Sequence, residues 1–326
     1  MSSYRRLGNS GLSVSALGLG TNAFGGRADK ATSIRVLHHA VDLGITFIDT
    51  ANIYTNTQSE QIIGEAFEGR RHDVILATKV GMKTGDGPYD KGSSRQHILR
   101  EVEKSLKRLR TDYIDLYQIH AFDPDTPLEE TLYTLDTLIR SGKVRYIGAS
   151  NYAAWQLMES LDISTRSGLA QYISVQPGYS LADRGVEREL LPFCMAHKIG
   201  IIPYFPLAGG ILTGKYSHGQ MPSDSRLDKD PRFAQRMDEE RVKLGEAVVQ
   251  IAAEIDTSAT ALSLAWLMYQ PQVATVIAGA TCESQLEENI KAIDLTLTAD
   301  VLQQLDEASE PFIYARSFGD TSRRKS

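Results

Sequence analysis

The sequence predicts an α/β fold, a (β/α)8 TIM barrel with a short N-terminal β-hairpin, on three observations. Helical stretches alternate regularly with short apolar runs along the chain. The apolar runs are unbroken, which is typical of parallel strands that are buried on both faces of a sheet. Eight such strand-helix units occur in one chain, and eight units close most simply into a barrel.

The elements are expected in the following order. Two short strands at residues 4–7 and 12–15 flank a Gly-rich turn and predict the hairpin. The barrel strands are expected at residues 16–20, 45–48, 74–78, 113–119, 144–149, 172–175, 201–203 and 274–277. The helices are expected at residues 34–43, 60–67, 95–109, 128–140, 154–160, 189–197, 240–255, 260–269 and 283–292, the last range being the final helix. Residues 205–238 are expected to form a long irregular segment.

The chain is expected to form one domain over residues 1–326, because no linker-like composition divides it. An open doubly wound sheet is the alternative arrangement of alternating strands and helices. That fold would place a G-x-G-x-x-G turn after its first strand. Here Gly18 and Gly20 are followed by Thr21, Asn22 and Ala23, so the fingerprint fails.

Composition excludes several classes of protein. With 42% hydrophobic and 23% charged residues, the chain has the balance of a globular protein with a large core. A net charge of -6 without an extended basic run predicts neither a nucleic-acid partner nor a membrane surface. No apolar run reaches membrane-spanning length, and the N-terminus lacks an export signal. Cys194 and Cys282, both in helix-like segments, form no disulfide or zinc pattern, so we expect a cytoplasmic protein.

Four polar residues are expected to meet at the carboxyl ends of the barrel strands. Asp49, Lys79 and His120 follow the second, third and fourth strands, and Tyr54 lies on the loop after the second. A buried carboxylate needs a partner, and Lys79 would supply it. The ammonium would lower the pKa of the Tyr54 phenol from its usual value of about 10, making it a general acid. With His120 orienting the same oxygen, these groups would stabilise an alkoxide forming on a carbonyl carbon.

Three stretches of the sequence carry a family resemblance. Residues 44–54, 106–120 and 142–151 resemble the signatures of the aldo-keto reductase superfamily, in its bacterial-type or potassium-channel-β-subunit-like branch. The resemblance runs from about residue 4 to about residue 305 and implies a nicotinamide-dependent carbonyl reductase on a barrel. It implies a catalytic tetrad of Asp49, Tyr54, Lys79 and His120.

The resemblance also implies which residues bind the cofactor. Ser150, Asn151 and Gln176 would bind the nicotinamide carboxamide, and Tyr204 would stack on the ring. Residues 221–236 are expected to cover the bound cofactor. The full set of expected cofactor-binding residues is Gly20, Thr21, Asp49, Ser150, Asn151, Gln176, Tyr204, Phe205, Pro206, Leu207, Leu212, Gly214, Lys215, Gly279, Thr281, Gln285, Glu288 and Asn289.

Two departures from the family pattern bear on the cofactor and on the acid. NADP-dependent members commonly place a basic residue soon after the last strand, but residues 280–282 contain none, and the next is Lys291. Each charged hydrogen bond missing from a dianionic phosphate costs about 1.5–3 kcal/mol. The family's usual preference still favours NADP(H), with NAD(H) as the alternative. Thr55 stands where the family usually has Gly, so the loop that bears Tyr54 is expected to be set differently.

The favoured function is the reversible, NAD(P)H-dependent reduction of an aldehyde or ketone, with a small-molecule carbonyl substrate. Tyr89, Phe24 and Tyr152 either line the substrate pocket or pack in the core, as aromatic residues usually do. The alternative is a regulatory or redox-sensing subunit that binds the cofactor and turns over slowly, like potassium-channel β-subunits. An added N-terminal inactivation segment is not expected here, which argues against it. A metal-dependent hydrolase would need several converging His and carboxylate ligands, and only His120 and Asp49 qualify.

Overall fold

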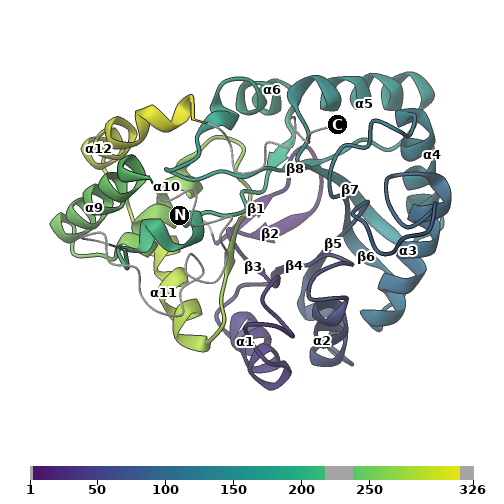
Figure 1. Cartoon of the computed structure of the whole chain (residues 1–326), viewed down its shortest axis with the longest axis horizontal. Helices are drawn as coiled ribbons and strands as arrows, with labels where there is room; N and C mark the ends of the chain where they lie inside the picture. The colour runs from purple at the N-terminus through teal and green to yellow at the C-terminus, as the bar shows by residue number, and fades with distance from the viewer. Residues whose placement is uncertain (1–2, 217–237, 316–326) are drawn as a thin grey trace.

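Eight parallel strands form the centre of the computed structural model, which describes residues 3–216 and 238–315 (Figure 1). Neighbouring strands in the chain are also neighbours in the sheet, and the last strand pairs back onto the first. The strands are β3 (Leu17–Gly20), β4 (Phe47–Asp49), β5 (Ile75–Val80), β6 (Ile114–Ile119), β7 (Val144–Ser150), β8 (Ser174–Gln176), β9 (Gly200–Ile201) and β10 (Val276–Gly279).

Backbone hydrogen bonds between the β9 and β10 regions close the sheet into a barrel. Ile201 bridges to Val273, and its N–H donates to the carbonyl of Gln272 at 2.7 Å. The N–H of Ile277 donates to the carbonyl of Pro203 at 2.9 Å. Closure leaves this eight-stranded sheet without a free edge among the described residues, and the expected (β/α)8 barrel is confirmed.

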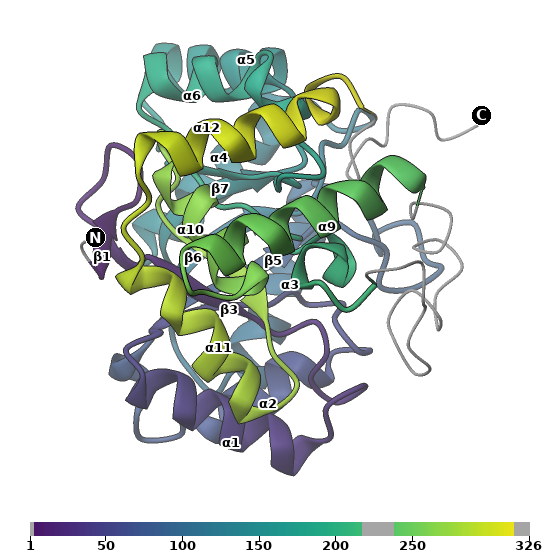
Figure 2. The same ribbon diagram turned by 90° about the vertical axis from the view of Figure 1, so that its left-hand side faces the viewer.

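Helices surround the strands, and Figure 2 shows α9 and α12 running alongside each other on the outside of the barrel. None of the helices in the described ranges combines the length and apolarity needed to cross a bilayer. The helices are α1 (Lys30–Asp42), α2 (Gln58–Ala66), α3 (Arg95–Arg108), α4 (Leu128–Arg140), α5 (Ala154–Ser167), α6 (Leu190–His197), α9 (Glu239–Glu254), α10 (Ala259–Tyr269), α11 (Glu283–Asp294) and α12 (Ala299–Ser309).

The structure corrects the expected helices at three places. The helix at 283–292 is not the last, because α12 and the short 3-10 helix η5 (Glu310–Ile313) follow it. The segment 205–238 is not wholly irregular, since it contains the 3-10 helix η3 (Ala208–Thr213). Cys282 stands at the N-cap position just before α11, without a side-chain cap hydrogen bond, and does not lie inside the helix.

Side-chain caps explain where several helices begin. The carboxylate of Asp29 accepts from the N–H of Thr32 at the start of α1, and Ser258 caps α10 in the same way. Such a cap satisfies one of the backbone donors that a helix leaves free at its N-terminus. Thr298 caps α12 by accepting from the N–H of Val301, which sets the start of the helix that the sequence analysis missed.

The N-terminal hairpin covers one end of the barrel. Strands β1 (Tyr4–Arg6) and β2 (Ser13–Ser15) pair antiparallel, as expected. Leu7 and Val14 are fully buried in one cluster with Phe47, which belongs to a barrel strand. Gly8, at φ 57°, lies against the backbone just before β8 and β9, where an added Cβ would sit 2.2 Å from the carbonyl oxygen of Ile173. The hairpin thus fills the end where the strands begin and leaves the opposite end for chemistry.

Candidate active site

A buried ammonium joins three of the four predicted catalytic residues. Nζ of Lys79, in β5, donates to Oδ2 of Asp49 at 2.6 Å and to the hydroxyl of Tyr54 at 3.2 Å. Its third donor reaches the carbonyl of Thr50 at 2.8 Å. Lys79 is 0% exposed and Asp49 is 2% exposed. The ion pair is therefore removed from water with all three ammonium donors satisfied.

Lys79 keeps its positive charge in this environment. Burial lowers the pKa of Lys79, but the charges of Asp49 and Tyr54 and their hydrogen bonds raise it, and the net direction is upward. The ammonium also lies 5.0 Å from the centre of the Tyr54 ring. A fixed cation beside a phenol favours the state in which the phenol has released its proton.

Two amides hold the other oxygen of Asp49. Nε2 of Gln176 donates to Oδ1 of Asp49 at 2.8 Å, and Nε2 of Gln118 approaches it at 3.4 Å. The sequence analysis missed Gln118, although a polar residue inside the apolar run 113–119 was a signal for it. These contacts orient the carboxylate toward Lys79.

His120 lies beside Tyr54 as an uncharged ring. The two ring centres are 6.0 Å apart with an interplanar angle of 78°, an edge-on contact. Burial, with a smaller contribution from the charge of Lys79, lowers the pKa of His120 from its usual 6.5 to about 3. Nδ1 of His120 is buried and has no hydrogen-bond partner within the described ranges. A neutral imidazole offers one donor and one acceptor, so it can still direct an N–H at an oxygen.

The backbone after Tyr54 is strained. Thr55, Asn56 and Thr57 all adopt left-handed conformations, with φ values of 47°, 53° and 73°. This region suits glycine and is unfavourable for β-branched residues such as Thr. The hydroxyl of Thr55 compensates in part by donating to the carbonyl of Phe24 at 2.5 Å. The loop therefore adopts a backbone conformation that favours glycine although it contains none. The hydrogen bond of Thr55 links this loop to the loop after β3.

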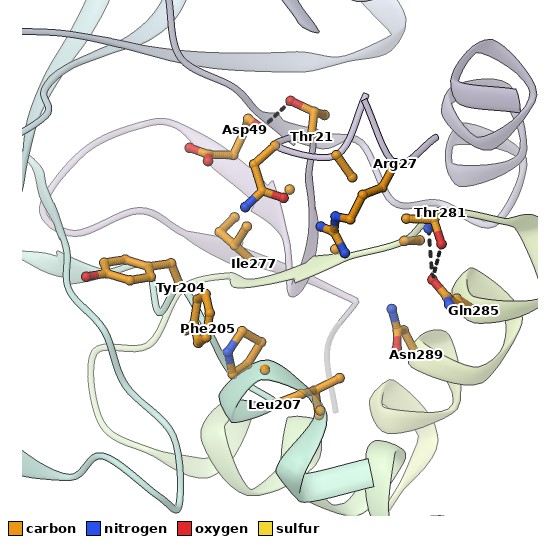
Figure 3. Close-up of a pocket in the computed structure, with 18 of the residues that line it drawn as sticks. Thr21, Arg27, Asp49, Tyr204, Phe205, Leu207, Ile277, Thr281, Gln285 and Asn289 are labelled. Carbon is orange, nitrogen blue, oxygen red and sulfur yellow. Dashed lines mark hydrogen bonds between the residues drawn. The ribbon is translucent and has the colours of Figure 1, made fainter. Parts of the chain in front are cut away.

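A cavity of about 560 Å³ extends from Tyr54 and His120 along the rim of the barrel to α11. Figure 3 shows side chains from β4, from the loop after β9 and from α11 converging on it. The predicted cofactor residues that line it are Gly20, Thr21, Asp49, Ser150, Asn151, Gln176, Tyr204, Phe205, Pro206, Leu207, Lys215, Gly279, Thr281, Gln285, Glu288 and Asn289. Leu212 and Gly214 are not brought to the wall, and Leu212 is fully buried in the core.

The structure also adds residues that the sequence analysis missed. Arg27 and Asn22, on the loop between β3 and α1, line the cavity, and so does Thr260 near the start of α10. Ile277 lies on its floor, where an added Cβ on Gly20 would meet the Ile277 side chain at 2.8 Å. The sequence analysis predicted site residues at the carboxyl ends of strands, and Arg27 was missed because it lies in the loop between β3 and α1.

The carboxyl ends of β6, β7 and β8 and the residues after β9 are linked by side-chain hydrogen bonds near Tyr54. Nδ2 of Asn151 donates to the carbonyl of His120 at 2.9 Å. The hydroxyl of Tyr204 donates to Oδ1 of Asn151 at 2.9 Å. Ser150 donates to the carbonyl of Gln176 at 2.9 Å. These bonds fix the residues that are predicted to hold the nicotinamide.

Glycines shape the middle of the cavity. Gly209 and Gly210 within η3 have φ values of 72° and 100°, which favour glycine. A Cβ on Gly210 would lie 2.2 Å from Cε of Lys215, so the lysine side chain lies directly over bare backbone. This arrangement lets both a backbone and a cation approach the same part of a ligand.

The far end of the cavity is polar. The N–H of Thr281 donates to Oε1 of Gln285 at 2.8 Å, as the dashed lines in Figure 3 show. Glu288 is engaged by Ser258 and by Lys291. Nδ2 of Asn289 is buried and has no hydrogen-bond partner among the residues of the described ranges. This amide is therefore able to donate to a ligand group at this end of the cavity.

A second cavity adjoins the first at His120, Asn151 and Tyr204, which line both. Its wall includes Tyr89 and Tyr152, two of the three aromatics considered for a substrate pocket. The third, Phe24, is 0% exposed and packs in the core. The predicted cover at 221–236 lies outside the described residues.

Comparison with known proteins identifies the family. Residues 16–310 match the Aldo/keto reductase family. The chain belongs to this family.

Relatives of this chain carry different names. It is 38% identical to a "Probable voltage-gated potassium channel subunit beta" of Arabidopsis thaliana, over 93% of this chain and 95% of the relative. It is 38% identical to an "Uncharacterized oxidoreductase YrpG" of Bacillus subtilis, with the same coverage of 93% and 95%. It is 33% identical to an "L-glyceraldehyde 3-phosphate reductase" of Escherichia coli O157:H7, over 93% of this chain and 91% of the relative.

The cavity fits the nicotinamide cofactors that the Aldo/keto reductase family generally uses. Such a cofactor is long and anionic in its middle. The cavity offers Lys215 over a glycine backbone in its middle part, and an unpartnered amide, Asn289, at its far end within the described chain. The residues present therefore suit a dinucleotide.

Proposed function

We propose that this aldo/keto reductase catalyses the reversible NAD(P)H-dependent reduction of an aldehyde or ketone to an alcohol. The observation that carries the proposal is the contact of one buried ammonium, Lys79, with both Asp49 and the hydroxyl of Tyr54. Tyr54 lines the first cavity, and His120 beside it lines both cavities. The reacting groups would thus meet where a cofactor pocket and a substrate pocket join.

The four side chains have distinct roles in this proposal. A nicotinamide cofactor held by the residues of the first cavity would supply a hydride for the carbonyl carbon. The hydroxyl of Tyr54 donates its proton to the carbonyl oxygen, and Lys79 stabilises the phenolate that remains. Asp49 keeps Lys79 charged and in place through the 2.6 Å ion pair. The uncharged His120 donates an N–H to the same oxygen and does not compete with Tyr54 as an acid.

The wall of the first cavity supports a defined cofactor orientation. Asn151 and Ser150 lie near Tyr54 and would hold the carboxamide of the nicotinamide. Nε2 of Gln176 already donates to Asp49, which leaves its Oε1 to accept from the carboxamide. The ring would lie against Tyr204, and the adenosine end would reach α11. NADP(H) is the favoured cofactor.

Substitution of the acid tests the proposal. Tyr54→Phe removes the proton donor and leaves the ring, so turnover should fall about 10²- to 10⁴-fold while cofactor binding persists. Tyr133→Phe, on the exposed side of α4, is the matched control. NADPH oxidation with a panel of aldehydes and ketones measures turnover, and the fluorescence of NADPH measures binding. If Tyr54→Phe reduced these substrates as fast as the parent, the acid assignment would be wrong.

A regulatory subunit with slow turnover is the second candidate, and the name of the Arabidopsis thaliana relative favours it. Both candidates need the same cofactor cavity, so binding alone does not separate them. A stopped-flow measurement with excess aldehyde and excess NADPH does. An enzyme consumes many equivalents of NADPH per chain, whereas a regulatory subunit consumes at most one equivalent quickly.

A further inference from the structure

Arg27 brings a positive charge to the cofactor cavity from the loop between β3 and α1. It lines the same cavity as Thr281, Gln285 and Asn289. Figure 3 shows its guanidinium pointing into the hollow, on the side where Thr281 and α11 lie. This is the end of the cavity where the sequence after β10 offers no basic residue before Lys291.

Within residues 3–216 and 238–315, no carboxylate is paired with Arg27. No hydrogen bond or ion pair joins its guanidinium to another residue of the described ranges, although Asp49 and Glu288 line the same cavity. Those two carboxylates are taken by Lys79 and by Lys291. Burial lowers the pKa of Arg27, but a guanidinium is so strong a base that it stays charged at neutral pH. An unpaired cation on a cavity wall favours an anionic ligand.

The loop that carries Arg27 is fixed by its own hydrogen bonds. The N–H of Gly25 donates to the carbonyl of Ala28 at 2.9 Å. The hydroxyl of Thr55, next to Tyr54, donates to the carbonyl of Phe24 at 2.5 Å. The backbone around Arg27 is thus already ordered, so binding a ligand does not cost conformational entropy of this backbone.

An amide with an unsatisfied donor lies at the same end of the cavity. Asn289 is 3% exposed, and its Nδ2 has no partner within the described ranges. Lys215, by contrast, lies over Gly210 in η3. The two cations therefore come from different walls, Lys215 beside the glycine backbone and Arg27 from the side of β3.

We propose that Arg27 binds the 2′-phosphate of NADP(H), at the end of the cavity where Asn289 lies. In this chain the β3–α1 loop would then supply the positive charge that residues 280–282, just after β10, lack. The inference rests on the proposed function, because it presupposes a dinucleotide in this cavity. A guanidinium suits the site, since it can donate two parallel hydrogen bonds to one phosphate. Lys215 is left for the diphosphate.

Paired binding titrations test this assignment. NADPH and NADH are titrated by their fluorescence into the parent, Arg27→Gln and the control Arg166→Gln, whose arginine is exposed on α5. Arg27→Gln should weaken NADPH at least about tenfold, which corresponds to about 1.4 kcal/mol, and should leave NADH nearly unchanged. Arg27→Lys should recover part of the NADPH affinity, because lysine restores the positive charge but cannot donate two parallel hydrogen bonds to one phosphate.

Calorimetry with 2′-phospho-ADP-ribose and ADP-ribose, which lack nicotinamide, should show the same contrast without any turnover. Equal weakening of both cofactors in Arg27→Gln would assign Arg27 to the diphosphate and overturn the inference. Unchanged NADPH affinity in Arg27→Gln would also overturn it and leave the proposed function standing. If the parent bound neither cofactor, the proposed function and this inference would fail together.

Discussion

Breaking the buried ion pair one partner at a time should be costly, whereas removing both charges should not. Lys79→Met leaves the carboxylate of Asp49 in a site that is 2% exposed, and Asp49→Asn leaves an ammonium that is 0% exposed. An uncompensated buried charge costs about 3–5 kcal/mol. The double variant leaves no buried charge, and similar replacements of buried pairs are often neutral. We expect it to be at least about 2 kcal/mol more stable than the sum of the single effects predicts.

Urea unfolding followed by circular dichroism measures the effect as shifts in midpoint. The surface pair Arg70–Asp73 is the control, because its N···O distance is 2.9 Å but its side chains are 45% and 41% exposed. Asp73→Asn should cost less than about 1 kcal/mol. Activity should be lost in all three variants of the buried pair, since none keeps an ammonium in contact with both Asp49 and Tyr54.

The reasoning fails if Lys79→Met unfolds at the same urea concentration as the parent. It also fails if the double variant loses as much stability as the two single variants together. Either result would mean that the charges in this site are stabilised independently of each other. The role of Asp49 in keeping Lys79 charged would then have no support.

Three further predictions concern single residues. The pKa of His120 is lowered from its usual 6.5 to about 3, so the free energy of unfolding should fall as pH drops from 6.5 toward 3. The urea midpoint of the parent should therefore fall more between about pH 7 and pH 5 than the urea midpoint of His120→Asn. Thr57→Gly should raise the free energy of unfolding by about 1 kcal/mol, because it relieves a φ of 73°, and unchanged thermal stability would contradict this. Gly210→Ala should weaken NADPH binding in fluorescence titrations, because its Cβ would meet Lys215 at 2.2 Å. Gly69→Ala, at φ 74° with open space, is the control for backbone strain alone.

The barrel and the reacting residues were predictable because short-range rules determine them. Side chains in a strand alternate between its two faces. The barrel register aligns Asp49 with Ala77 and Lys79 with Gln118, so inward-facing residues at strand ends are neighbours. Once the apolar runs were located, Asp49, Lys79 and His120 were expected to converge because they stand at the carboxyl ends of three neighbouring strands.

The errors have local causes as well. Helix α12 was missed although Thr298 at its N-cap, with Val301 and Leu305 buried on one face, carried the usual signal for a helix. The short helix η3 could not be recognised from periodicity, because Gly209 and Gly210 interrupt it with left-handed backbone. The family resemblance implied that Leu212 binds the cofactor, but the side chain of Leu212 is fully buried in the core.

Arg27 was not predicted, although it lines the same cavity as the predicted residues of α11, because a loop carries it. Arg27 and Asn289 are far apart in sequence, and no strand register relates them. What brings Arg27 to the cavity is the path of the loop after β3, which Thr55 ties to the loop that bears Tyr54. The proposed reaction therefore depends on positions that the barrel fixes, whereas the proposed cofactor preference depends on a loop that can vary without moving Asp49 or Lys79. A change of cofactor preference in this chain should then require substitutions in the β3–α1 loop and none at Tyr54, Lys79 or Asp49.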